Sequence, residues 1–164
     1  LNGYRKKEKM PANIGEYTVP LGSPEITRSG TDITLLSYGS TFNLCTEAAE
    51  RLADLGIEVE LVDARTLLPF DLNSLTAYSV AKTNRLLVVD EDVPGGASSY
   101  LLEDVLNRQG AWQHLDSQPA TLTAKPHLPA YSSDGDYFSK PSVDDIVEKV
   151  YAIMNESSPA SYPL

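Results

Sequence analysis

The stretch DITLLSYGSTFNLCTEAAERLADLGIEVELVDARTLLPFD, residues 32–71, decides the fold. The apolar run at 33–36 is rich enough in aliphatic residues for a strand that is buried on both faces. A tight turn then leads into a helix, and we expect the hydroxyl of Ser40 or Thr41 to cap it. That helix carries one apolar stripe and ends at Gly56, and a second apolar run follows as another strand. Such a strand–helix–strand unit makes the two strands parallel, with a right-handed crossover.

The same alternation of strands and helices continues along the chain. Asp71 is placed to cap a second helix, with Leu72 and Leu75 on its inner side. Ser142 begins the last helix, and Asp145 stands at the spacing of a capping box. The remaining predicted elements are a short edge strand at 24–28, a buried strand at 86–89, a helix at about 97–109 and a weak strand at 120–123. We therefore expect an α/β protein.

Length and charge limit the class of protein. The 164 residues suit one domain, and the net charge of -10 at pH 7 would repel the phosphates of nucleic acid. The same charge disfavours an anionic membrane surface, and no apolar run approaches the roughly 20 residues of a spanning helix. The single cysteine, Cys45, cannot form an internal disulfide, which fits a reducing, cytoplasmic compartment. We therefore expect neither a nucleic-acid partner nor a membrane partner.

The chain divides into three parts by composition. Residues 1–22 are punctuated by prolines and glycines, and we expect a linker or arm from a missing upstream domain, either solvated or docked on a neighbour. Residues 23–155 are expected to form the folded domain. The Ser/Pro-rich residues 156–164 predict a flexible tail. Because the first residue is Leu1, we expect the chain to be a piece of a longer protein.

A long stretch without periodicity, residues 124–141, separates the last strand from the last helix. We expect an irregular loop, and loops of this length inside a compact domain are usually functional or packed on a neighbour. Tyr131 is the aromatic residue in this loop that we take as an interface candidate. The segment Asp134-Gly135-Asp136 lacks the earlier acid and the closing glutamate of a calcium loop, which favours a surface turn.

Signals for catalysis are sparse. The turn at 38–41 lies where phosphates often bind, but it has one glycine and no phosphate-binding motif, so a plain turn is favoured. Cys45 lies on the apolar stripe of its helix and is expected to be a core thiol. His114 and His127 stand in irregular segments without the spacing of metal ligands. The sequence therefore predicts no catalytic, cofactor-binding or metal-binding residue.

Charged residues follow two of the predicted strands. Asp63 and Arg65 follow one strand and Glu91 follows another, at the carboxyl ends where open α/β sheets place ligands. The functional interpretation is a rim that faces a ligand or a partner chain. The favoured interpretation is a local ion pair that fixes the loop leading into Pro69, because structural ion pairs are common at such strand ends. The interface or rim candidates are Asp63, Arg65, Glu91 and Tyr131.

These motifs together resemble one family. The runs SGTDITLLSYGST, TEAAERLADLGIEVELVDARTLLPFD and TNRLLVVDEDVPGG are similar to the C-terminal domain of the transketolase superfamily. The likeness is closest to the β-type half of the decarboxylase component of 2-oxoacid dehydrogenase complexes, and it extends from about residue 17 to residue 154. Its densest motif is Asp63-x-Arg65-x-Leu67-x-Pro69-Phe70-Asp71.

The resemblance implies a three-layer α/β/α fold with a five-stranded, mostly parallel sheet and one antiparallel edge strand. It also implies that the parent enzyme uses thiamine diphosphate and magnesium, bound between two upstream domains, so that this domain itself holds no cofactor. In the family, this domain contributes to subunit assembly and to docking. The implied partners are the upstream thiamine-binding domains, a second copy or partner subunit, and the acyltransferase core of the complex.

Two departures from the family pattern bear on the subunit arrangement. β-type subunits usually have a histidine before the glutamate where this chain has Asp90-Glu91, and a Gly-Tyr-Asp-x-Pro-type loop where it has residues 129–141. The second variant is similar to single-chain enzymes with fused alpha and beta halves. On resemblance alone, the substrate is a branched-chain 2-oxoacid such as 2-oxoisovalerate, with pyruvate second. The alternatives are the C-terminal domain of transketolase or deoxyxylulose-phosphate synthase, and a free-standing flavodoxin-like or receiver-like binding module.

Overall fold

Five strands form one sheet in the computed structural model, which describes residues 10, 12–128 and 133–163. They are β1 (Glu25–Arg28), β2 (Ile33–Ser37), β3 (Val59–Asp63), β4 (Leu86–Val89) and β5 (Ala120–Leu122). Their order across the sheet is β1–β3–β2–β4–β5, and β1 is antiparallel to β3, whereas the other pairs are parallel. A register shift between Ile26 and Arg28 interrupts the pairing of β1. The mostly parallel sheet with one antiparallel edge strand is confirmed.

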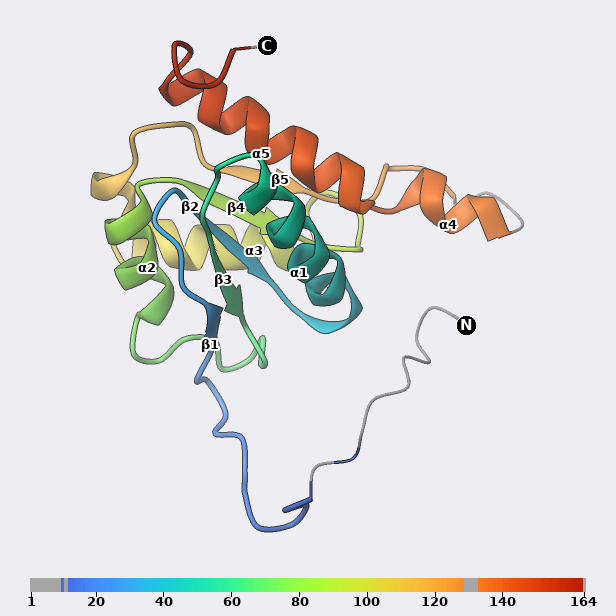
Figure 1. Cartoon of the computed structure of the whole chain (residues 1–164). Coiled ribbons are helices and arrows are strands. Elements are labelled where there is room, and N and C mark those ends of the chain that lie inside the picture. Colours follow the sequence, from blue (N-terminus) through green and yellow to red (C-terminus); the bar gives the residue numbers. More distant parts are fainter. Residues whose placement is uncertain (1–9, 11, 129–132, 164) are drawn as a thin grey trace.

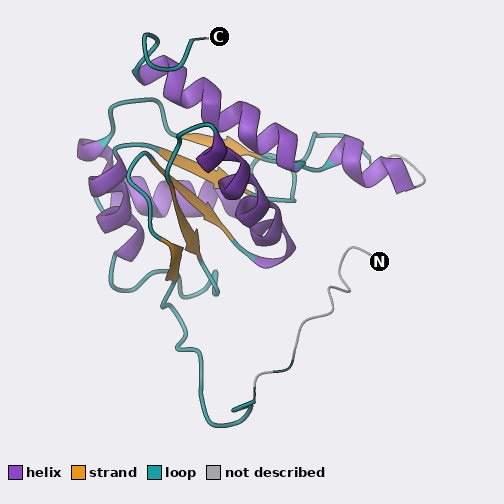
Figure 2. Ribbon diagram, in the orientation of Figure 1, coloured by secondary structure: helices purple, strands orange, loops and turns teal. Residues whose placement is uncertain are grey.

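Helices cover both faces of this sheet (Figure 1). One face shares an apolar cluster with α1 (Gly39–Asp54) and α5 (Val143–Ser157), and the other shares a second cluster with α2 (Leu75–Thr83) and α3 (Ala97–Glu103). α3 continues as the π-helical turn η1 (Asp104–Arg108), so the helix predicted at about 97–109 is confirmed, and the 3₁₀ turn η2 (Ala111–His114) follows. The strands lie between the two sets of helices (Figure 2), which gives the three layers.

Successive residues of β2 point to opposite faces of the sheet, and both faces are covered. Leu35 belongs to the cluster with α1 and α5, and Leu36 belongs to the cluster with α2 and α3. All of β2 is buried, as predicted. Thr34 faces α2, where its hydroxyl lies 2.7 Å from the hydroxyls of Ser79 and Thr83. This polar group inside the core is therefore satisfied.

The first helix begins earlier than the sequence predicts. α1 starts at Gly39, whose φ of 60° suits glycine, and the N-cap residue is Tyr38 in an extended conformation. No side chain caps this end, so the cap expected from Ser40 or Thr41 is wrong, because both residues lie inside the first turn. The N–H groups of α1 therefore begin without a capping oxygen from their own segment.

Asp71 holds the start of α2, as predicted. Its two carboxylate oxygens accept hydrogen bonds from the backbone N–H groups of Leu75, at 2.8 Å, and Thr76, at 2.7 Å. Asp71 itself is fully buried. Leu72 is 63% exposed, so the prediction that it lies on the inner side of the helix is wrong. Its backbone N–H instead donates to the carbonyl of Gly22, which ties the residue after the 63–71 loop to the start of the domain.

The predicted irregular loop at 124–141 contains a helix. α4 (Ser133–Ser139) includes Asp134-Gly135-Asp136, so the surface turn expected there is wrong. Figure 1 shows α4 projecting beyond the edge of the sheet before the chain enters α5. α5 begins with the predicted capping box of Ser142 and Asp145. Tyr131, in the same loop, lies outside the described residues.

The two ends of the described chain differ. α5 extends to Ser157, two residues past the predicted boundary, and the hydroxyl of Tyr151 then donates to the carbonyl of Pro163 at 3.0 Å. Residues 12–20 are exposed and run away from the sheet (Figure 1). Large exposed apolar side chains line this arm, namely Met10, Ile14, Tyr17, Val19 and Leu21. Among the helices described here, none has the length and apolar character needed to cross a membrane.

Candidate functional site

Polar residues follow three neighbouring strands at the carboxyl edge of the sheet. Tyr38 follows β2, Asp63 ends β3, and Asp90 follows β4. Because parallel strands end on the same side, these residues share one rim of the domain, where ligands of open α/β sheets usually bind.

Asp90 is the fixed centre of this rim. It is fully buried, and its carboxylate accepts hydrogen bonds from the hydroxyl of Tyr38 at 2.7 Å, the backbone N–H of Ser98 at 3.0 Å and that of Asp92 at 3.1 Å. Burial and the bond to Asp90 raise the pKa of the Tyr38 hydroxyl, so this group stays protonated. Asp90 thus joins the ends of β2 and β4 to the start of α3.

Asp63 and Arg65 have different partners. One carboxylate oxygen of Asp63 accepts a hydrogen bond from the backbone N–H of Arg65 at 3.0 Å. The guanidinium of Arg65 pairs with Glu25 on β1, across the antiparallel edge. Burial raises the pKa of the Asp63 carboxyl, and the bond to the Arg65 amide opposes that shift. These contacts fix the turn after β3, in which Arg65 has a φ of 57°.

Glu91 joins three elements that are distant in sequence. One of its carboxylate oxygens lies 3.2 Å from the hydroxyl of Ser40 in α1 and 3.2 Å from the ammonium of Lys140, between α4 and α5. Lys140 and Glu91 are both partly exposed. Glu91 thus brings a carboxylate to the amino-terminal turn of α1, where the helix dipole favours negative charge. A carboxylate of the chain itself therefore occupies the side of the turn at 38–41 that was considered for phosphate.

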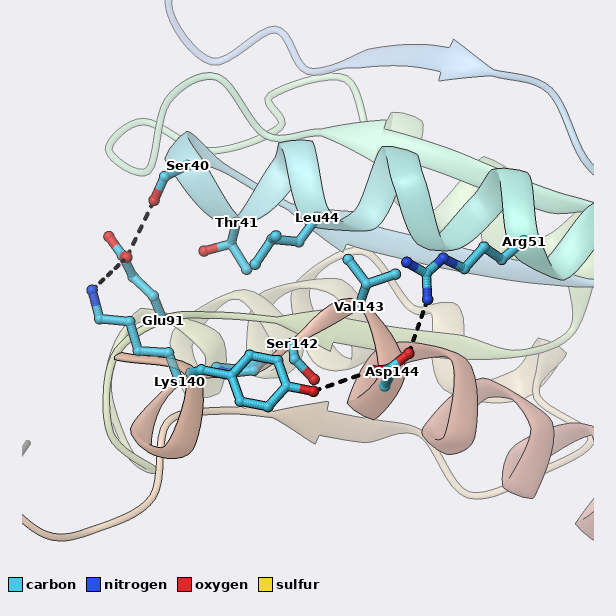
Figure 3. A pocket seen from close by; sticks show the side chains of 11 residues that line it. Ser40, Thr41, Leu44, Arg51, Glu91, Lys140, Ser142, Val143 and Asp144 are labelled. Atoms are coloured by element: carbon cyan, nitrogen blue, oxygen red, sulfur yellow. Dashed lines mark hydrogen bonds and ion pairs between the residues drawn. The ribbon is translucent and has the colours of Figure 1, made fainter. Parts of the chain in front are cut away.

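A pocket of about 420 Å³ opens beside this contact, between α1 and the junction of α4 and α5 (Figure 3). We call it the α1–α5 pocket. Leu44, Pro141 and Val143 supply its apolar wall. Its far end is formed by Arg51, which pairs with Asp144 at 2.9 Å, and the hydroxyl of Tyr137 donates to the same carboxylate at 3.1 Å. Its residues are Ser40, Thr41, Leu44, Arg51, Glu91, Tyr137, Lys140, Pro141, Ser142, Val143 and Asp144.

The other sequence candidates lie apart from this pocket. Cys45 is fully buried, and burial raises the pKa of its thiol to about 12, as expected of a core residue. His127 is exposed beside the ring of Phe138, and the carbonyl of His114 accepts a hydrogen bond from the Asn84 side chain. Within residues 10, 12–128 and 133–163, no group of three or more His, Cys, Asp or Glu side chains is placed to hold a metal ion.

Three of the rim candidates lie among the described residues. Glu91 lines the pocket, whereas Asp63 and Arg65 do not. Sequence reasoning missed Thr41 as a pocket residue, since it was considered only as a cap. It also missed Lys140, which follows a helix that the sequence did not predict, and Asp144, which lies in the predicted last helix. The capping box that begins α5 was the available signal, since it places Asp144 in the first turn of that helix.

The family model described as "Transketolase, C-terminal domain" matches residues 22–146. The chain belongs to the transketolase C-terminal domain family. The matched residues include all five strands and the 63–71 loop. The family membership leaves the free-standing flavodoxin-like or receiver-like module without support.

Relatives similar to this transketolase C-terminal domain include beta subunits of oxidoreductases. The acetoin:2,6-dichlorophenolindophenol oxidoreductase subunit beta of Bacillus subtilis is 34% identical over 93% of this chain and 44% of the relative. The pyruvate dehydrogenase E1 component subunit beta of Rhizobium meliloti is 32% identical over 92% of the chain and 32% of the relative. The 2-oxoisovalerate dehydrogenase subunit beta of Bacillus subtilis is 32% identical over 76% of the chain and 36% of the relative. The chain thus spans less than half the length of these relatives.

Two solved structures share the fold of the domain. A split-gene transketolase described as an inactive beta4 tetramer matches with a TM-score of 0.69 and 19% identity, over 87% of this chain and 45% of that one. A 2-oxoglutarate:ferredoxin oxidoreductase from Magnetococcus marinus matches with a TM-score of 0.55 and 17% identity, over 87% of this chain and 21% of that one. These similarities concern the fold alone.

Proposed function

We propose that this chain is the C-terminal assembly and docking domain of a thiamine-diphosphate-dependent 2-oxoacid dehydrogenase. The observation that carries the proposal is the identity of 32–34% over 92–93% of the chain to the beta subunits of an acetoin oxidoreductase and of a pyruvate dehydrogenase E1 component. The parent enzyme would decarboxylate a 2-oxoacid oxidatively and pass the acyl group to a lipoyl group. Its upstream domains would bind the cofactor, and the acyltransferase core would dock on the present domain.

The geometry of the rim supports a role outside the chemistry. Asp63 and Asp90 are engaged with backbone N–H groups, and Arg65 is paired with Glu25. The described residues offer no group of acidic or histidine side chains that fits a magnesium ion, so no chemical step is assigned to them. By contrast, large apolar side chains are exposed on the arm and on α4, as on surfaces that contact other chains.

The substrate is part of the proposal. A branched-chain 2-oxoacid such as 2-oxoisovalerate is the first candidate and pyruvate the second, and relatives named for each are 32% identical to the chain. Acetoin is a further candidate, since the acetoin oxidoreductase subunit is 34% identical over 93% of the chain. A C-terminal domain of transketolase or deoxyxylulose-phosphate synthase is the alternative within the family.

Two measurements test this proposal. The full-length parent enzyme should reduce 2,6-dichlorophenolindophenol with 2-oxoisovalerate at a higher kcat/KM than with pyruvate or acetoin. Transketolase activity without any oxidation of a 2-oxoacid would overturn the proposal. In calorimetry, the isolated 164-residue chain should bind neither thiamine diphosphate nor its magnesium complex. Micromolar binding there would place the cofactor site in this domain and contradict the assembly role.

A further inference from the structure

We propose that the α1–α5 pocket binds a small aliphatic monocarboxylate. The carboxylate would be held by the hydroxyl of Thr41, the ammonium of Lys140 and the amino-terminal turn of α1. The aliphatic chain would lie against the apolar wall. This inference concerns a ligand site and does not depend on the assembly role proposed above.

The size and wall of the pocket suit such a molecule. Its volume of about 420 Å³ falls in the range of small-molecule sites, which are mostly apolar with a few placed polar groups. Pro141 is buried, and Leu44 and Val143 are partly buried with faces toward the opening. An aliphatic chain placed there would remove these surfaces and its own surface from water.

Thr41 supplies a polar group that is ready to bind. Its side chain lines the pocket although the residue is only 3% exposed, and its hydroxyl makes no hydrogen bond to the residues that the structure describes. Figure 3 shows this hydroxyl pointing from the first turn of α1 toward the side where Glu91 lies. Because this hydroxyl opens into the pocket, a ligand oxygen that accepts a hydrogen bond from it would take the place of water.

The end of α1 beside Thr41 favours an anion. α1 is a 16-residue helix with no acidic residue in its first turn and no side-chain cap, so the positive end of its dipole is not neutralised within the helix. Glu91 shows which group fits there, because its carboxylate is bound between Ser40 and Lys140. The Glu91–Lys140 pair is partly exposed and therefore weak, so a ligand carboxylate can compete with Glu91 for the ammonium of Lys140.

The far end of the pocket selects against a second negative charge. The guanidinium of Arg51 already binds two carboxylates, those of Glu47 at 2.7 Å and Asp144 at 2.9 Å. Asp144 also accepts the hydroxyl of Tyr137. A second carboxylate on the ligand would meet Asp144, so a monocarboxylate should bind better than a dicarboxylate of the same length.

Calorimetry with octanoate on the 164-residue chain tests this site. We expect saturable binding at one site, and no binding of octanamide or octanedioate. Thr41→Val should lower the affinity for octanoate about five-fold by removing one hydrogen bond. Lys140→Met should lower the affinity for octanoate about ten-fold by removing a charge-assisted hydrogen bond. Glu91→Gln should tighten binding, because it removes the charge that competes for Lys140.

Matched variants separate this site from non-specific binding. Thr46→Val makes the same change on the exposed side of α1, and Lys149→Met removes a lysine from α5 away from the pocket, and neither should change the affinity. Melting curves identify any variant that fails to fold. The proposal is overturned if the folded chain shows no saturable binding of octanoate. It is equally overturned if Thr41→Val and Lys140→Met bind octanoate as their matched variants do.

Discussion

The guanidinium of Arg108 donates a hydrogen bond to the backbone carbonyl of Asp71 at 2.9 Å. The same nitrogen lies 3.3 Å from the carbonyl of Phe70 and 2.8 Å from the buried carboxylate of Asp104. The π-helical turn η1 therefore clamps the loop that carries the densest motif of the family. This loop in turn starts α2 through the side chain of Asp71, so one arginine supports two elements on the same face of the sheet.

Replacing this arginine should destabilise the domain. Arg108→Met removes the hydrogen bonds to both carbonyls and leaves the buried Asp104 carboxylate with fewer partners. The free energy of unfolding should therefore fall by about 2 kcal/mol. Urea unfolding followed by circular dichroism measures the loss. Arg28→Met is the control, because Arg28 makes a partly exposed pair with Glu58 at 3.6 Å that should contribute less than about 1 kcal/mol. Equal unfolding midpoints for the two variants would contradict the role of the clamp.

Asp63 should make the stability of the domain depend on pH. Burial raises the pKa of its carboxyl in the folded chain, so the folded state holds the proton more tightly than the unfolded state does. The contribution of Asp63 to the free energy of unfolding is therefore most favourable below the pKa that Asp63 has in the unfolded chain. It is lost as the pH rises through the pKa that Asp63 has in the folded chain. Asp63→Asn should raise the free energy of unfolding at neutral pH by less than about 1 kcal/mol, and the gain should vanish near about pH 3.

Urea titrations of Asp63→Asn at several pH values measure this effect. Glu50→Gln is the control, since Glu50 is exposed on α1, and its difference from the parent chain should stay small at every pH. A gain for Asp63→Asn that is the same in acid and at neutral pH would show that ionisation of Asp63 is not its cause.

Cys45 should be unreactive in the native protein. The thiol is fully buried, and its pKa of about 12 leaves almost no thiolate at mildly alkaline pH. Ellman's reagent should therefore detect no thiol in the native chain and one thiol after unfolding in urea. Rapid reaction of the native chain would mean that α1 opens locally, or that the thiol is not part of the core.

Assembly of the full-length enzyme should depend on the exposed aromatic face of α4. Phe138 is 58% exposed, and the ammonium of Lys125 lies 3.8 Å from the centre of its ring. Phe138→Ser should shift the enzyme toward smaller species in sedimentation velocity, while kcat per assembled active site stays the same. Tyr78→Ser, an exposed aromatic change on α2, is the control. Normal assembly with a large loss of turnover would instead indicate a role in the active site.

Elements with a strong local signal could be predicted from the sequence. The buried run of β2, the capping carboxylate of Asp71 and the capping box of Ser142 each follow from a few neighbouring residues, and the structure contains all three. α4 could not be predicted, because Asp134-Gly135-Asp136 disfavours a helix and the segment has no apolar period. Here the surrounding structure overrides local propensity.

The α1–α5 pocket could not be predicted from the sequence either, because it depends on α4. Thr41 and Lys140 are about a hundred positions apart, and they meet only because α4 returns the chain to the amino end of α1. Glu91 could be placed at the correct rim, since it follows a parallel strand, but its partners Ser40 and Lys140 could not. A side chain can thus be assigned to an edge from the pattern, whereas its contacts depend on the packing of distant segments.

The open margins of the sheet bear on how the protein behaves at high concentration. The edge strand β5 has only three residues, and a register shift interrupts the pairing of β1 at the opposite edge of the sheet. Short and irregular edge strands present few unpaired N–H and C=O groups in a regular row. Another chain therefore cannot easily pair with them and begin a fibre. With ten surplus negative charges that also repel neighbouring copies, the domain can expose large apolar side chains without aggregating.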